Sequence, residues 1–130
     1  MEKIISQQIS DFLGFLSEIV DDYKFSQDEV KRLEDLTMDY MHKLELQHNN
    51  YHECAKIASA LRQCRIDRRI CKDRVTVLEP LVQCLTSDKG KLILSQLQQT
   101  LGAVRKAERS TQDRRYIPRI LSAEEYEGTF

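Results

Sequence analysis

Glycine, proline and tryptophan are scarce in this sequence. Its 130 residues include four glycines, two prolines and no tryptophan, and neither glycine nor proline occurs between Gly14 and Pro80. Sheet proteins use both residue types in the tight turns that join strands. Hydrophobic residues make up 41% of the chain and charged residues 32%, a balance that suits charged helices. We therefore expect an all-α protein.

Paired cysteines and long apolar runs are also missing. No two of the four cysteines form a CxxC pair, and all four lie in apolar helical patterns, so we expect reduced core residues. They are Cys54, Cys64, Cys71 and Cys84. No apolar run approaches the roughly 20 residues of a membrane span. Asp11 interrupts the N-terminal apolar stretch, and no small-residue cleavage site follows it. These absences predict a cytoplasmic protein without a membrane partner.

Motifs of catalysis are absent as well. The sequence has no glycine-rich phosphate loop and no nucleophile elbow, so we expect neither an enzyme nor a cofactor. His48 and His52 are four residues apart, with Glu45 one turn earlier, but the HExxH order of zinc proteases is missing. Exposed histidines beside a helix break explain this spacing better than a metal site does.

Helical periodicity runs along almost the whole chain. Apolar residues at spacings of three and four predict a helix over residues 3–23. They are Ile5, Ile9, Phe12, Leu16, Ile19 and Tyr23, with Leu13 and Val20 beside them. After a break, Ser26 and Glu29 match a capping box, and Phe25 and Val30 match a hydrophobic staple. The second helix is therefore expected to begin near Gln27.

A heptad-like pattern then extends toward residue 85. His48–Asn50 is the only polar cluster weak enough in helix propensity to form a turn, so a hairpin and a continuous helix both remain open. The apolar residues beyond it follow a 3.5-residue repeat that only Arg68 interrupts, which is typical of a coiled coil or long antiparallel hairpin. They are Cys54, Ile57, Leu61, Cys64, Cys71, Val75, Leu78, Val82 and Leu85. Pro80 predicts a kink near residue 76.

The C-terminal third predicts a turn, a last helix and a tail. Thr86 or Ser87 provides a cap, and the last helix continues to about residue 109. The rest is expected to be extended, apart from one short turn capped by Ser122 and Glu125. We thus expect three to four helices, with residues 1–121 as a single domain and residues 122–130 as an acidic tail.

The charges divide unequally along the chain. Residues 1–60 carry 6 Lys/Arg and 12 Asp/Glu, whereas residues 61–121 carry 14 and 6. Within the basic part, four side chains spaced three, four and three apart form one row, which we call the basic row: Arg62, Arg65, Arg69 and Lys72. Arg68 stands at a core position, where a guanidinium needs a carboxylate partner and can specify register.

Two interpretations of the basic row are open. In a hairpin, the row would lie beside acidic residues of the first half and form solvated ion pairs that contribute little. Those acids are Asp28, Glu29, Glu34 and Asp35, with Arg32 opposite Asp67. In a continuous helix, the row would face an antiparallel second copy, a nucleic acid or another protein. A homodimer is expected in either case.

Nucleic acid is the alternative partner. A second group of cations could extend the row and adds one aromatic ring: Arg105, Lys106, Arg109, Arg114, Arg115 and Arg119, with Tyr116. Phosphate contacts need only exposed cations. Single-strand binding adds aromatic platforms, and none occurs between Tyr51 and Tyr116.

Residues 51–121 bear a resemblance beyond these patterns. The runs "YHECAKIASALRQCRIDRRICKDRVTVLEPLVQCL" and "LGAVRKAERSTQDRRYIPRIL" resemble small helical proteins of unassigned function encoded by phages and prophages of Gram-positive bacteria. The resemblance carries over no site residues. It implies an accessory protein that binds a host or phage protein, in some cases one that blocks a defence system.

The sequence thus favours a non-enzymatic interaction protein acting in the bacterial cytoplasm. We expect an acidic protein partner on the basic row, together with the tail segment 116–121. The residues expected to bind are Arg62, Arg65, Arg68, Arg69, Lys72, Arg114, Arg115, Tyr116 and Arg119.

Overall fold

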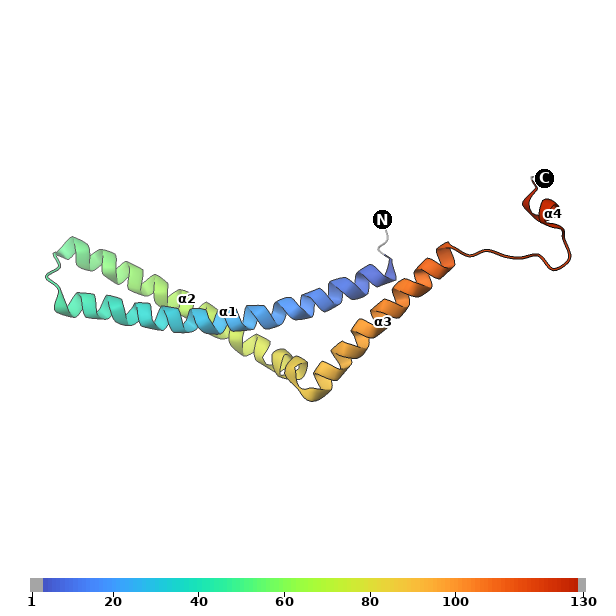
Figure 1. Cartoon of the computed structure of the whole chain (residues 1–130). Helices are drawn as coiled ribbons and strands as arrows, with labels where there is room; N and C mark the ends of the chain where they lie inside the picture. The colour runs from blue at the N-terminus through green and yellow to red at the C-terminus, as the bar shows by residue number, and fades with distance from the viewer. Residues whose placement is uncertain (1–3, 129–130) are drawn as a thin grey trace.

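The computed structural model describes residues 4–128, and within that range the chain forms helices and no strand. Three helices are long: α1 (Ile5–Leu46), α2 (Tyr51–Thr86) and α3 (Asp88–Gln112). A short α4 (Ala123–Glu127) lies in the C-terminal tail. The expected all-α fold, with a long antiparallel hairpin and an extended tail, is confirmed (Figure 1).

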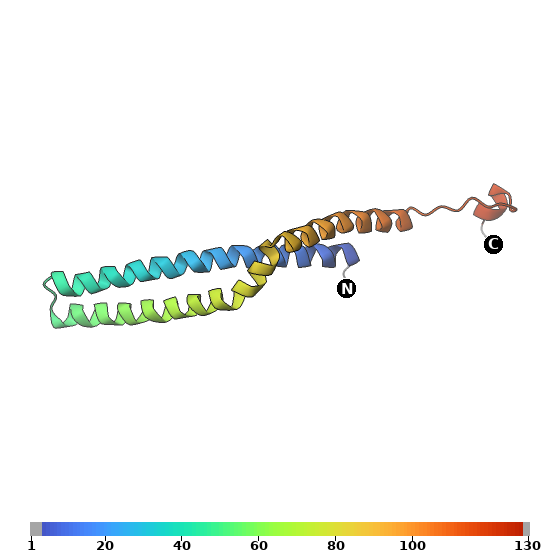
Figure 2. The ribbon, with the colours of Figure 1, turned by 90° about the horizontal axis from the view of Figure 1, so that it is seen from below.

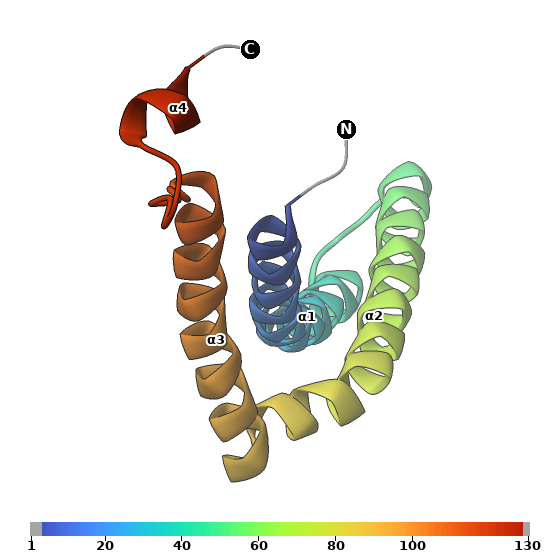
Figure 3. The ribbon, with the colours of Figure 1, turned by 90° about the vertical axis from the view of Figure 1, so that its right-hand side faces the viewer.

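The molecule is an elongated rod in which α1 packs against both other long helices. Its C-terminal half lies antiparallel to α2, and its N-terminal half lies antiparallel to α3, which continues in the direction of α2 (Figure 2). Seen along the rod, α2 and α3 stand on either side of α1, and the yellow end of α2 passes from one side to the other (Figure 3). Helices α2 and α3 therefore pack against different halves of the longer α1.

The predicted break between two N-terminal helices is wrong, because α1 continues through residues 24–27. Ser26 is buried, and its hydroxyl donates to Asp22 Oδ1 at 3.3 Å within the helix instead of capping a new one. Glu29 pairs with Arg32, and Phe25 is exposed rather than stapled. Ile19, Ser26 and Leu33 are all buried and stand seven residues apart, so one uninterrupted helix keeps this buried face continuous.

Of the two alternatives that the sequence leaves open at His48–Asn50, the structure shows the turn: α1 ends at Leu46 and α2 begins at Tyr51. Asn50 begins α2 as its N-cap, where its side-chain oxygen accepts from the backbone N–H of Glu53 at 2.8 Å. The Asn49 amide donates to the carbonyls of Lys43 and Gln47, which closes the end of α1. Lys3, the first residue of the predicted first helix, lies outside the described residues.

The predicted seam of α2 faces α1 as expected. Its apolar members are buried or half-buried, and the Cys64 thiol lies 3.1 Å from the carbonyl oxygen of Leu33. All four cysteines are free. Burial raises the pKa of the Cys71 thiol. The prediction of a core position is wrong for Cys84, which is exposed because, at 100° per residue, it lies on the opposite side of α2 from buried Val82.

The connection from α2 to α3 needs a glycine. Pro80 lies inside α2, which bends in its yellow part, as predicted, and still continues to Thr86 (Figure 3). Ser87 caps α3 by accepting from the N–H of Gly90 at 3.1 Å. Gly90 is buried, and a Cβ there would overlap the carbonyl group of Cys84. The predicted cap is confirmed, and α3 extends slightly beyond the expected end.

The C-terminal segment leaves the rod. Residues 113–122 have no regular structure, and the predicted cap is present, with the Ser122 hydroxyl oxygen accepting from the N–H of Glu125 at 3.2 Å. Within the described range, α4 contacts none of the other helices (Figure 1). Residues 129–130 of the predicted acidic tail lie outside that range. No helix in residues 4–128 has an apolar stretch long enough to cross a membrane.

Candidate interaction surface

The basic row lies on the outside of α2. All four members of the row (Arg62, Arg65, Arg69 and Lys72) are exposed, and none forms an ion pair with another described residue. At 100° per residue, the row lies roughly 110° around the helix from the seam that faces α1. Their charges are therefore directed to solvent.

The neighbouring arginines differ from the row, because each has a partner on α1. The side chain of Arg68 is only 14% exposed, and its Nε and Nη2 donate to Glu34 Oε1 at 3.0 and 2.9 Å. Arg74 donates from Nε to both carboxylate oxygens of Asp22, at 2.9 and 2.8 Å. This hydrogen bonding holds the pKa of the Asp22 carboxyl below its ordinary value.

The acids expected to neutralise the basic row do not reach it. Glu34 is engaged by Arg68, and hydrogen bonding from Arg32 on its own helix lowers the pKa of Glu29. Asp28 and Asp35 are exposed and form no ion pair within residues 4–128. Pairing between the halves of the chain thus involves Arg68 and Arg74 and leaves the row unneutralised.

The other predicted binding residues lie elsewhere. Arg114, Arg115 and Arg119 are exposed in the irregular tail segment. The ring of Tyr116 lies against that of Tyr126 from α4, with centroids 5.6 Å apart. The tail departs at the α3 end of the rod, so the structure does not join these residues to the row (Figure 1).

Sequence reasoning missed two features of α2. One is the pairing of Arg74 with Asp22, which depends on the unbroken course of α1. The other is a second set of exposed apolar side chains, at spacings of four, seven and four, which we call the outer stripe: Ile66, Ile70, Val77 and Leu81. That spacing is visible in the sequence, but spacing alone does not show which of two apolar faces on one helix is covered.

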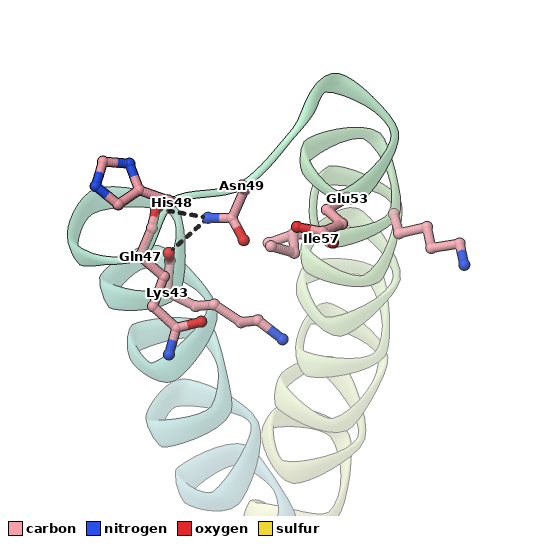
Figure 4. Close-up of a pocket in the computed structure, with 7 residues that line it drawn as sticks. Lys43, Gln47, His48, Asn49, Glu53 and Ile57 are labelled. Carbon is pink, nitrogen blue, oxygen red and sulfur yellow. Dashed lines mark hydrogen bonds between the residues drawn. The ribbon is translucent and has the colours of Figure 1, made fainter.

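Several hollows in the surface of the described residues lie where α1 meets α2 or α3. One of about 340 Å³ lies at the hairpin turn, where Asn49 bonds the end of α1 and Ile57 faces it from α2 (Figure 4). The His48 ring points away from the α2 residues in this view. Since α1 ends before His48 and α2 begins after it, His48 and His52 do not share a helix. The described residues contain no group of three metal-ligating side chains.

Comparisons of the chain with protein-family models, with curated protein sequences and with solved structures find no match.

Proposed function

We propose that this chain is a non-catalytic helical interaction protein whose basic row binds an acidic surface on a protein partner. What supports this role is the contrast between neighbouring arginines on one helix. Arg68 and Arg74 have carboxylate partners on α1, whereas the row has none among residues 4–128. Four like charges at helical spacing match a complementary acidic surface, which would fix orientation and speed association.

The proposed partner class is a host protein in the bacterial cytoplasm, modulated or inhibited by the binding. This part of the proposal rests on the resemblance of residues 51–121 to phage and prophage proteins, some of which act on defence systems. Nucleic acid is the second candidate, because exposed cations are sufficient to contact a phosphate backbone.

The test is fluorescence anisotropy with four labelled probes: a glutamate decapeptide, single-stranded DNA, duplex DNA and a structured RNA. Wild type is compared with Arg65→Glu/Arg69→Glu and with a control, Lys89→Glu/Lys91→Glu, which changes the same net charge on an exposed part of α3. We expect the row variant to bind the decapeptide about tenfold more weakly or worse. Wild-type helicity should be retained in both variants.

Two results would overturn the proposal. Equal decapeptide affinity of row and control variants would show that the row is not the binding surface, and loss of folding in the row variant would assign it a structural role. Binding to nucleic acid alone, with a steep salt dependence that the row variant reduces, would select the second candidate. Wild type, the row variant and the control variant then serve as baits in a bacterial lysate. The partner sought is a protein that wild type and the control variant retain and the row variant loses.

A further inference from the structure

The rod leaves an unusually large surface uncovered. The accessible area of the whole chain, to which the rod and the extended tail both contribute, is 11024 Å² for a mass of 15.3 kDa. A compact monomer of that mass exposes about 7,100 Å², so the excess is roughly 3,900 Å². A stable dimer buries about 1,200–2,000 Å² in total. The excess is ample for one such interface.

The outer stripe is an exposed apolar surface with the geometry to form such an interface. Ile70 and Val77 are 60% and 75% exposed, and Ile66 and Leu81 are 41% and 37% exposed. At 100° per residue, the stripe lies roughly 140° from the seam, on the side of α2 that faces away from α1. No described residue covers it, and its spacing is that of a helix-packing seam.

The stripe is self-complementary. Its four members are arranged symmetrically in sequence about the midpoint between Asp73 and Arg74. A twofold axis at that midpoint sets two α2 helices antiparallel, with Ile66 of one copy toward Leu81 of the other and Ile70 toward Val77. An isologous interface requires such a patch, because the same residues serve both copies.

We propose that a second copy of this chain docks on the outer stripe, so that two hairpins meet through antiparallel α2 helices. The twofold axis is normal to the plane that contains the two helix axes, so a residue and its symmetry mate in the second copy lie on the same side of that plane. The two basic rows therefore lie on one face of the dimer. This doubles the cationic surface and makes it bivalent.

The first test is sedimentation velocity of the full chain over a range of concentrations. Wild type is expected to be a dimer. Ile70→Asp/Val77→Asp should raise the dissociation constant about a hundredfold or more, since four apolar side chains lose their burial across the two copies. Ile93→Asp removes a similarly exposed apolar side chain from α3 and should leave the dimer intact. Circular dichroism checks that all variants remain helical.

A second test does not depend on a disruptive variant. Asp73→Cys places two thiols beside the proposed axis, where a thiol reagent with a span of about 10 Å should join the copies. Exposed Cys84 of the wild type is the control, since its two copies would stand about 30 Å apart at 1.5 Å per residue. Lys56→Cys, with a separation of about 50 Å, is a second control.

Three outcomes would overturn the inference: a monomeric wild type, a dimer unaffected by the stripe variant, or an Asp73→Cys variant that links no better than the controls. The dimer does not depend on the proposed binding function. If the dimer proposal is wrong, sedimentation and cross-linking will show it. If the binding proposal is wrong, the anisotropy of the row variants will show it.

Discussion

The guanidinium of Arg68 reaches across the hairpin to Glu34, and both of its hydrogen bonds end on the same carboxylate oxygen. Arg68 occupies a seam position between Cys64 and Cys71, so this pair forms only when α2 lies in one register against α1. Two purely apolar helix faces can pack in several registers, and one polar seam residue with a single partner can specify one of them. The ion pair thus favours this register of the hairpin over shifted ones.

We predict a measurable coupling between these two residues. A double-mutant cycle with Arg68→Ala and Glu34→Ala in urea unfolding should give about 0.5–1 kcal/mol, as expected for a pair with one half-exposed member. Arg69→Ala, which removes a neighbouring exposed cation, should change the free energy of unfolding by less than about 0.5 kcal/mol. Strictly additive effects of the two substitutions would rule out the pair as a register device.

Two glycines should respond to alanine with opposite signs. Gly90→Ala places a Cβ against the Cys84 carbonyl, a backbone group that cannot move cheaply, and should reduce the free energy of unfolding by about 1–3 kcal/mol. Gly102→Ala meets nothing within 4 Å in an exposed helical position, and should increase it by about 0.5–1 kcal/mol. Thermal unfolding measures both, and a tolerated Gly90→Ala would mean that the α2–α3 turn can adopt another geometry.

Glu108 caps α1 from a different helix. Its carboxylate accepts from the backbone N–H of Ser6 at 2.9 Å and from the Ser6 hydroxyl at 2.8 Å. Negative charge at a helix N-terminus is favourable, so Glu108→Ala should destabilise the α1–α3 end by about 1 kcal/mol. Hydrogen exchange should show faster exchange near Ser6 while the hairpin amides are unchanged. Glu79→Ala, on exposed α2 surface, is the control.

Acid should remove the contribution of the Asp22–Arg74 pair. The folded-state pKa of Asp22 lies below its ordinary value of 3.8, so the pair stabilises the fold fully above the unfolded-state pKa and loses this effect as the pH falls through the folded-state value. Urea unfolding should therefore show a stability difference between wild type and Asp22→Asn at pH 7 that shrinks below about pH 4. For Asp28→Asn, which has no ion pair in the described range, the difference from wild type should not follow this trend.

The seam of α2 was predictable because a 3.5-residue repeat depends only on local spacing. The caps at Ser87 and Ser122 followed from side chains that hydrogen-bond within three residues, whereas weak helix propensity at His48–Asn50 left the turn there undecided. The break near Ser26 was mispredicted because that prediction also used only local hydrogen-bonding signals. A capping signature shows that side chains could accept hydrogen bonds from the backbone N–H groups at a helix start. It carries no information on the burial that a continuous α1 obtains from α2 and α3.

The state of the basic row could not be derived from the sequence. Whether the row finds ion-pair partners depends on which α1 carboxylates are already paired with other arginines. Arg74 pairs with Asp22 because α1 is unbroken. The side of each helix that faces a partner is also a tertiary property. Spacing placed Arg68 in the seam correctly, whereas the course of α3 along α1 had no local signal.

The division of α1 between two partners sets an order for folding during synthesis. The hairpin contacts join segments that leave the ribosome close together, whereas Ser6 waits for Glu108, 102 residues later. The N-terminal half of α1 is thus made first and covered last. Until α3 has emerged, the apolar side chains in the N-terminal half of α1 lack their partner helix, so we expect a chain that ends before α3 to leave them exposed.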